Sequence, residues 1–397
     1  MALLATDPKV AFERRYPFED RYLSYLVKFG LLTGRRGPSP HVDSVQLMDY
    51  YDDRFGSVPW GAPEPAERAM MPSSAECFLS LWQAFSTSAR GTNDRLTHYA
   101  EKVPDWLPAV IRNDVPCRTI NLVRDPRDVF LSARDFVRVR GAVGFGMGDG
   151  HSELDAARHT AHAWLSFAEN ARADRTRTDT IALRYEDMVQ EPGPNAARLS
   201  TFLGLRLVPA EAPSEYLASH RTSGDVSRSV GRWQREPLSD VVRTCLETQL
   251  QDLMLDYGYK PSEGAPRPSE IPCHPERAVN GTVQVVDGTM LISVGNQDFN
   301  MELQPTPLRA VSTDEIWICV QGDTGDHCSI YWRGEAFSEE RSVHVTFRPG
   351  RHWQILRFPV GKHPLWRDVV EQLRIDLFNG NVAPTAGGRL RWIRYVT

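Results

Sequence analysis

An arginine and a serine eight residues apart form the pair in this sequence whose types and spacing best suit anion binding. They lie in RTINLVRDPRDVFLSARDF, residues 118–136, where Arg124 ends an apolar run and Ser132 follows within a helical pattern. An arginine guanidinium can donate two hydrogen bonds to one phosphate group, and a serine hydroxyl nearby can add another. The pair therefore predicts a phosphate site.

The elements around this pair would place it between the end of a strand and the start of a helix. Residues 117–123 read as a short buried strand, and residues 126–140 read as a helix with proline in its first turn. Asp125 can cap that helix, and Asp128 favours its positive end, whose free N–H groups attract anions. Ligands of open α/β sheets bind at the carboxyl ends of strands. The alternative is a surface arginine paired with Asp125 or Asp128, and spacing alone leaves both interpretations open.

The order of strand-like and helix-like segments predicts two domains of different class. Residues 1–262 alternate helical and strand patterns, which is typical of an α/β domain with a mostly parallel sheet flanked by helices. Residues 263–277 are rich in Pro, Ser and Glu and read as a linker. Residues 278–397 hold nine strand-like runs, most of them separated by turn residues such as Asp287-Gly288, which predicts an all-β sandwich of jelly-roll type.

Composition excludes several classes of partner. The formal net charge of -5 gives no general attraction to nucleic acid or to a membrane surface. No run approaches the roughly 18 apolar residues of a membrane span, and the first residues lack the pattern of a secretion signal. The six cysteines have no CxxC spacing, so we expect reduced thiols and neither a zinc site nor a disulfide framework. These features predict a cytoplasmic protein without a membrane span.

The stretch LVRDPRDVFLS resembles the segment of sulfotransferases that binds the 3′-phosphate of 3′-phosphoadenosine 5′-phosphosulfate (PAPS). In that family a strand-end arginine and a helix serine eight residues later contact the phosphate, and Arg124 and Ser132 match both positions. Three further stretches resemble the family in the same order, namely HYAEKVPDWLPAVI, LRYEDMVQEPGPNAARLSTFLGL and SRSVGRWQREPLS. The four matches cover about residues 95–260. They imply a P-loop-like fold, PAPS as co-substrate, adenosine 3′,5′-bisphosphate (PAP) as product, and no metal.

The resemblance implies roles for three more residues. Lys102 is similar to the family lysine that contacts the transferring sulfuryl group, where a mobile positive charge is useful. Tyr185 resembles a tyrosine near the nucleotide, and Arg228 lies in the late loop that folds over it. Each has an alternative: a surface lysine paired with Glu101, a core tyrosine at a strand end, and an arginine in a loop that does not reproduce the family's Arg-Lys-Gly form.

A hydroxyl acceptor also needs a general base. Some family members use a glutamate a few residues after a turn of the form hP-x-V, and Glu13 follows the similar LLATDPKVAFE stretch with an offset of one residue. The alternative is an exposed glutamate beside Arg14 and Arg15. Glu101 is the second candidate for the base because it adjoins Lys102.

One family segment has no counterpart in this sequence. Sulfotransferases carry a strand and a P-loop-like segment, of the type Pro-Lys-Ser-Gly-Thr-Thr, that binds the 5′-phosphosulfate. LLATDPKVAFE resembles the end of the family's first helix and the turn after it, which come directly after the P-loop. We therefore expect Met1 to lie within the first helix and the first strand and P-loop to lie upstream or to be absent. The 397-residue chain alone should then transfer sulfate weakly or not at all, and a version extended upstream should transfer it. Equal activity of the two with radiolabelled PAPS would contradict this expectation.

The C-terminal region bears on the acceptor. Its pattern CSIYWRG, SVHVTFRPG and LRIDLFNG is similar to jelly-roll modules of bacterial glycan-modifying enzymes, which favours a saccharide or glycoconjugate acceptor, with a phenol or a peptide tyrosine as the alternatives. The alternative function is a glycan-binding protein with a non-catalytic sulfotransferase-like scaffold. A nucleotide kinase is disfavoured because no GxxxxGK[ST] motif is present. Five of the ten tryptophans lie in this region, and their rings can either stack on sugars or fill the sandwich core: Trp317, Trp332, Trp353, Trp366 and Trp392.

Overall fold

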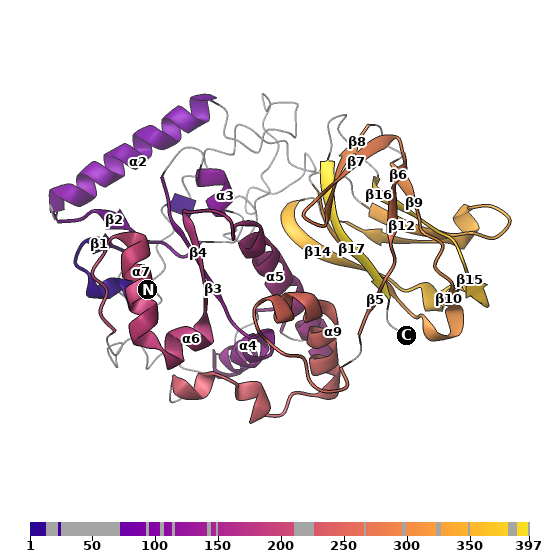
Figure 1. The fold of residues 1–397 in the computed structure, drawn as a ribbon, viewed down its shortest axis with the longest axis horizontal. Helices are drawn as coiled ribbons and strands as arrows, with labels where there is room; N and C mark the ends of the chain where they lie inside the picture. The colour runs from indigo at the N-terminus through magenta and orange to yellow at the C-terminus, as the bar shows by residue number, and fades with distance from the viewer. Residues whose placement is uncertain are drawn as a thin grey trace. The chain divides into compact units, whose positions relative to one another are not determined.

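In the computed structural model the described residues form two units, one made of the described residues up to 265 and one of the described residues from 267 to 395 (Figure 1). Each unit has its own core, and each is described by itself. The structure describes residues 1–12, 23–24, 72–92, 95–103, 107–112, 116–140, 144–147, 150–209, 226–265, 267–295, 299–322, 327–347, 350–379 and 387–395.

Parallel strands organise the first unit. Strand β3 (Thr119–Val123) pairs in parallel with β4 (Thr180–Arg184), so that Val123 lies opposite Arg184. Strand β1 (Val10–Ala11) pairs in parallel with β2 (His98–Tyr99). This parallel pairing confirms the predicted α/β class and aligns the carboxyl ends of β3 and β4 at one edge, where both strands are followed by helices.

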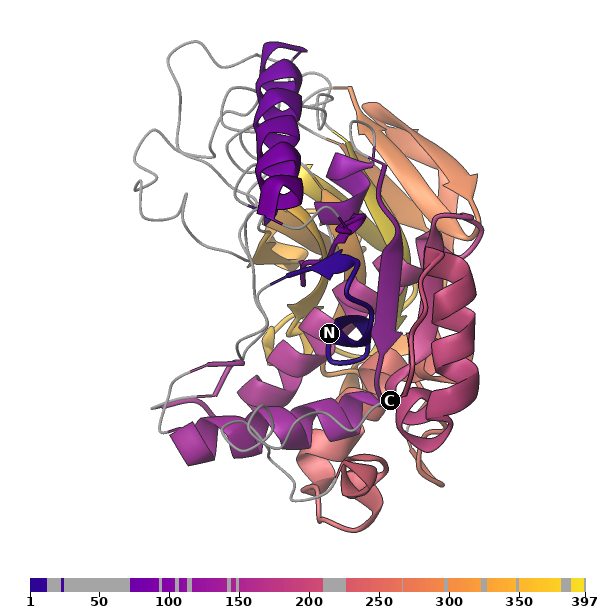
Figure 2. The ribbon, with the colours of Figure 1, turned by 90° about the vertical axis from the view of Figure 1, so that its left-hand side faces the viewer.

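Helices surround these strands. Leu199 and Leu203 of α7 pack with Leu183 of β4 in one apolar cluster, beside the strand pair (Figure 2). Helix α5 starts with a capping box between Ser152 and Asp155. The helices are α2 (Pro72–Thr92), α3 (Leu107–Ile111), α4 (Pro126–Arg140), α5 (Glu153–Ala173), α6 (Tyr185–Gln190), α7 (Pro192–Leu203) and α9 (Asp240–Asp256), with single turns η1 (Leu4–Thr6), η3 (Ser227–Ser229) and η4 (Arg232–Gln234).

The second unit is an antiparallel β-sandwich, as predicted. One sheet has the order β14-β11-β17-β8-β7 with β5 beside β17, and the other has the order β13-β12-β16-β9-β6. All nine strand-like runs of the sequence form strands, and β5 with the start of β6 falls within residues 263–277. The strands are β5 (Ser269–Glu270), β6 (Cys273–Val279), β7 (Gly281–Val286), β8 (Thr289–Val294), β9 (Asn300–Leu303), β10 (Leu308–Arg309), β11 (Ile316–Gly322), β12 (His327–Trp332), β13 (Ser342–Thr346), β14 (Gly350–Phe358), β15 (Val369–Val370), β16 (Leu373–Asn379) and β17 (Gly387–Tyr395), and β10 pairs with β15.

Turn chemistry and aromatic packing explain much of this sandwich. Asp287 and Gly288 join β7 to β8 with φ angles of 49° and 69°, which is the type I′ geometry that a two-residue hairpin loop favours. Trp332 is fully buried, donates from Nε1 to the Leu365 carbonyl and meets Trp366 edge to face at 5.2 Å. All five tryptophans of this region are at most 9% exposed, and Trp332 and Trp366 belong to the apolar core, so none of the five offers an exposed ring for stacking on sugar.

Two expectations from composition can be compared with the described residues. The five cysteines described there, Cys117, Cys245, Cys273, Cys319 and Cys328, are all free thiols. Among the helices in the described ranges, none combines the length and the apolar character that a membrane crossing requires.

Candidate functional site

Arg124 lies directly after β3, at the carboxyl edge of the parallel strand pair. Its Nη2 donates to the Ser229 carbonyl at 2.7 Å, and its guanidinium carbon lies 4.7 Å from the centre of the Tyr185 ring. Trp164 fixes the backbone by donating from Nε1 to the Arg124 carbonyl at 2.7 Å. The Nε–H of Arg124 is buried and has no partner within the described residues. The guanidinium is therefore held in place with donor capacity remaining.

Tyr185 and the segment around Ser229 complete this cluster. Tyr185 is the first residue of α6, directly after β4, and its hydroxyl lies 2.8 Å from the Ser229 Oγ. Ser229 is buried in η3, whereas its neighbour Arg228 is exposed. The carbonyl of Arg228 accepts a hydrogen bond from Arg235 Nη2 at 2.7 Å. Residues 227–236, called the late segment below, thus contact the carboxyl edge of both strands.

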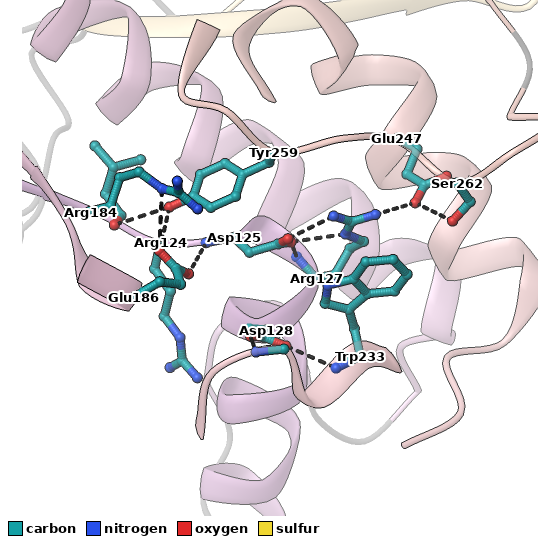
Figure 3. A network of polar contacts seen from close by, with 12 residues as sticks. Arg124, Asp125, Arg127, Asp128, Arg184, Glu186, Trp233, Glu247, Tyr259 and Ser262 are labelled. Carbon is teal, nitrogen blue, oxygen red and sulfur yellow. Dashed lines mark hydrogen bonds and ion pairs between the residues drawn. The ribbon is translucent and has the colours of Figure 1, made fainter. Parts of the chain in front are cut away.

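Behind Arg124, a buried ion-pair network fixes the start of α4 (Figure 3). The Asp125 carboxylate caps the helix by accepting from the Arg127 N–H at 2.9 Å, and it also accepts from the Arg127 guanidinium at 2.9 and 2.7 Å. Arg127 is 1% exposed and reaches Glu247 at 2.6 Å. Burial alone would lower the pKa of Arg127, but the two carboxylates outweigh it and raise the pKa. In Figure 3 the Arg124 guanidinium points away from this network.

Glu186 links the ends of the two strands. Its Oε1 accepts from the Asp125 N–H at 3.0 Å, and its Oε2 accepts from the Tyr259 hydroxyl at 2.7 Å. Burial, together with the charge of Glu186, raises the pKa of Tyr259, so this hydroxyl stays protonated and donates. The "YED" stretch therefore positions the strand ends through Glu186, while Tyr185 faces the Arg124 side.

Asp128 clamps the late segment to α4. Its side chain is fully buried, with Oδ2 accepting from the Gly231 N–H at 2.7 Å and Oδ1 accepting from the Trp233 N–H at 2.9 Å. Gly231 has φ +63°, a conformation that favours glycine. Burial raises the pKa of Asp128, and the two N–H groups oppose that shift. The Trp233 ring packs against Arg127, whose guanidinium carbon lies 3.5 Å from the ring centre, so Trp233 packs the late segment against the start of α4.

A second contact to α4 comes from Arg232, between the two residues that Asp128 holds. Arg232 is 3% exposed and bonds to Asp135 of α4 and to Glu236, with Nε to Glu236 Oε1 at 2.9 Å. The bonds from Arg232 lower the pKa of Glu236. These contacts hold the middle of the late segment on α4, next to Ser229, which contacts Arg124.

The other predicted site residues have different surroundings. Ser132 lies in the second turn of α4 and is partly buried, and Lys102 is exposed a few residues after β2. Glu13 falls outside the described residues. Glu101 accepts four hydrogen bonds, from Leu23 N–H at 2.8 Å, Ser24 N–H at 2.9 Å, the Ser24 hydroxyl and the Tyr99 hydroxyl at 2.7 Å. A carboxylate so engaged fits a structural role better than that of a general base.

A cavity of about 400 Å³ opens on the far side of the Asp125 network. Asp125, Arg184, Glu186, Tyr259 and Lys260 contribute to its lining, which does not include Arg124. Arg184 covers the Tyr259 ring at 4.7 Å and lies 3.9 Å from Glu186. Val230 and Gly231 of the late segment also line it, so the cavity adjoins the Arg124 cluster although Arg124 itself is not in its lining.

Comparison with known families decides the class of the first unit. Residues 103–223 match the family model of the sulfotransferase domain. Residues 103–223, within the first unit, are therefore similar to the sulfotransferase domain. The match spans β3, α4 and β4 and so contains Arg124, Ser132 and Tyr185. A comparison with curated protein sequences finds no match.

Solved structures similar to the chain fall into two groups. The sulfotransferase domain from the curacin biosynthetic pathway has 15% identity and a TM-score of 0.34, and the match covers 48% of this chain and 74% of that one. A low-affinity xylan-binding module, CBM86, from Roseburia intestinalis has 9% identity and a TM-score of 0.23, covering 31% and 92%. A family 29 carbohydrate-binding module from Piromyces equi has 12% identity and a TM-score of 0.23, covering 30% and 78%.

Sequence reasoning missed the clamps on the late segment. It assigned Asp128 only to the helix terminus, whereas the Asp128 carboxylate binds two backbone N–H groups about a hundred residues away. It also missed Ser229, the residue that contacts both Arg124 and Tyr185. The glycine in SRSVGRW was a usable signal, because a glycine between polar residues often marks a turn with positive φ.

Proposed function

We propose that the sulfotransferase domain binds PAPS and transfers its sulfuryl group to a hydroxyl of a saccharide or glycoconjugate. One observation supports the donor most directly: Arg124, Tyr185 and Ser229 converge at the carboxyl edge of β3 and β4. This edge is where open α/β sheets bind ligands, and a guanidinium with spare donors suits a phosphate dianion.

In this proposal Arg124 and Ser132 bind the 3′-phosphate of the donor. The Tyr185 ring packs against the Arg124 guanidinium, and the late segment with Arg228 covers the nucleotide. The Nη2 of Arg124, which bonds to the Ser229 carbonyl at 2.7 Å, would turn toward the phosphate when the donor enters. The bond to the carbonyl has a charged donor only, whereas the phosphate adds a charged acceptor, so this exchange favours binding.

The transfer step follows from positioning and electrostatics. The acceptor oxygen attacks the sulfur in line, the bond from sulfur to the bridging phosphate oxygen breaks, and PAP leaves with that oxygen's electron pair. Glu13 would take the proton from the acceptor hydroxyl, and Lys102 would stabilise the negative charge that develops on the bridging oxygen. These two roles stay predictions from the sequence.

Binding of two nucleotides tests the donor assignment. PAP and adenosine 5′-monophosphate differ by the 3′-phosphate that Arg124 would contact. We expect PAP to bind more tightly by about 1.5–3 kcal/mol, the contribution of a hydrogen bond to a charged group, or about 10- to 150-fold. Equal affinities in titration calorimetry would contradict the proposal.

Transfer is then measured with the version of the protein extended upstream, PAPS labelled in its sulfuryl group and a panel of soluble polysaccharides. We expect label to appear in at least one glycan and to be reduced when Arg124 is replaced by alanine. Tight PAP binding without transfer to any acceptor would instead favour the alternative function, a glycan-binding protein with a non-catalytic scaffold.

A further inference from the structure

One face of the five-stranded sheet of the sandwich carries polar side chains in an ordered array. Along β12 the side chains alternate, so that Cys328, Ile330 and Trp332 enter the apolar core. The residues between them, His327, Ser329 and Tyr331, share the opposite face. The same alternation on β16 places Arg374 and Asp376 on this face, since Leu373, Ile375 and Leu377 belong to the core. Cross-strand register sets Tyr331 opposite Arg374 and Ser329 opposite Asp376.

The planar guanidinium group of Arg374 lies at the centre of this face. Its Nε and Nη2 donate to the two oxygens of Asp376, each at 2.9 Å, and its guanidinium carbon lies 4.2 Å from the Tyr331 ring centre. The Tyr331 hydroxyl donates to Glu339 at 2.9 Å. The ring of Phe337 approaches Arg374 at 5.5 Å. Asp376 and Tyr331 are buried beneath, whereas the Arg374 side chain is 25% exposed.

His344, on the neighbouring strand β13, adds a second planar group to this face. Its Nδ1 lies 2.7 Å from the Ser329 Oγ and its Nε2 lies 2.9 Å from the Ser342 Oγ. The side chain is nonetheless 46% exposed. A histidine fixed at both ring nitrogens loses little conformational entropy when a ligand covers its face, which is the advantage of a preorganised site.

The charges of this face are paired within it. Arg374 is neutralised by Asp376, and Arg277 of β6 lies 3.4 Å from Glu302 of β9. Glu339 adds a negative charge beside His344, at 3.5 Å from its Nε2. A surface with paired charges and one extra carboxylate does not attract an anionic ligand. Fixed planar groups with hydrogen-bonding edges suit instead a ligand that presents both C–H faces and hydroxyl groups, as sugars do.

We propose that this face binds a neutral glycan and discriminates against the sulfated form of the same glycan. This inference rests on the proposed function. The face would keep the glycan acceptor bound to the protein and release the glycan as its hydroxyl groups become sulfated. Binding itself requires no donor, so failure of this inference and failure of the proposed transfer are distinguishable. Loss of PAP binding with intact glycan binding would remove only the proposed function.

The test uses the full chain in affinity electrophoresis and calorimetry with laminarin, xylan, galactomannan and hydroxyethylcellulose, at about 0.15 M salt to limit nonspecific electrostatic attraction. The best-bound polysaccharide is then compared with its chemically sulfated derivative. We expect at least one neutral polysaccharide to bind, and its sulfated derivative to bind about tenfold more weakly or worse, as like charge near Glu339 disfavours it. Absence of binding to every neutral polysaccharide, or tighter binding of the sulfated derivative, would overturn the proposal.

Variants locate the binding face. We expect His344→Ala and Arg374→Ala each to weaken glycan binding about tenfold, the first through the loss of the imidazole face that packs on the sugar and the second through the loss of one or two hydrogen bonds. Arg374→Ala leaves Asp376 buried without its partner, so His344→Ala, at a half-exposed position, is the variant less prone to misfold. Arg391→Ala is the matched control, because Arg391 bonds to Asp287 and Thr289 at the end of the other sheet. Unchanged glycan affinity in folded His344→Ala would contradict the assignment.

Discussion

Replacing Asp128 by asparagine should loosen the late segment without removing any group from the phosphate site. The two Asp128 oxygens accept from the N–H groups of Gly231 and Trp233 at 2.7 and 2.9 Å, inside a fully buried environment. An asparagine keeps one acceptor and turns an NH2 group toward the other N–H. One charge-assisted hydrogen bond is lost and one buried donor is left unsatisfied, which costs about 1.5–3 kcal/mol.

Hydrogen–deuterium exchange measures this cost where it arises. If the late segment opens locally before exchange, a loss of about 1.5–3 kcal/mol accelerates exchange of its amides by about 10- to 150-fold. The peptide covering residues 227–236 should report the change, and peptides from β3 and β4 should not. PAP affinity should fall in the same variant, because the loosened late segment then covers the nucleotide less well.

Asp240→Asn is the matched control for this experiment. Asp240 also lies in the first turn of a helix, but its side chain is 87% exposed and pairs only with Arg243 among the contacts of the described residues. We expect exchange in the late segment and PAP affinity to stay unchanged in that variant. If Asp128→Asn left exchange of residues 227–236 at the wild-type rate, the clamp would not stabilise the segment and the reasoning would be refuted.

Three further predictions concern single interactions. Arg232 lowers the pKa of Glu236 from its ordinary value of 4.5, so the ionised group stabilises the fold above that pH and this contribution is lost as pH falls through the lowered pKa. Between about pH 6 and pH 3, the free energy of unfolding measured with urea should therefore fall less for Glu236→Gln than for wild type. Equal decreases in the two proteins would argue against a stabilising pair of Arg232 and Glu236. Tyr185→Phe keeps the ring under Arg124 but removes the bond to Ser229, so PAP affinity should fall by about 0.5–1.5 kcal/mol in calorimetry. A loss as large as that of Arg124→Ala would mean that the hydroxyl does more than position Ser229. Trp332→Ala should destabilise the sandwich by about 3–5 kcal/mol in urea unfolding, because Trp332 is fully buried against Trp366, and a loss below about 1 kcal/mol would contradict that packing role.

The sequence predicted local elements well because their signals are local. The apolar run before Arg124 and the helical period after Pro126 specify β3 and α4 directly, and the structure has both. The sandwich strands were equally legible, since alternation and turn pairs such as Asp287-Gly288 lie within a few residues of each other. Four motifs in order indicated the sulfotransferase class before any geometry was known, and the family model of the sulfotransferase domain agrees over residues 103–223.

The contacts that hold the site together join residues far apart in the sequence, and no local sequence pattern indicates them. Asp128 and Gly231 are 103 residues apart, and Arg127 and Glu247 are 120 residues apart. A carboxylate in the first turn of a helix has a sufficient local explanation in the helix dipole, so nothing in the sequence pointed to a second partner. For Glu101 the sequence suggested a base because Lys102 adjoins it, whereas folding directs donors from residues 23–24 and Tyr99 onto its carboxylate.

The central claim is that Arg124 binds the 3′-phosphate of the sulfuryl donor, and titration calorimetry of PAP with wild type and Arg124→Ala tests it most directly. Arg177→Ala serves as the control, because Arg177 pairs with Asp179 at the surface of the same unit. The account predicts that Arg124→Ala weakens PAP binding by about 1.5–3 kcal/mol while Arg177→Ala leaves it unchanged. Wild-type affinity in a folded Arg124→Ala protein would contradict it.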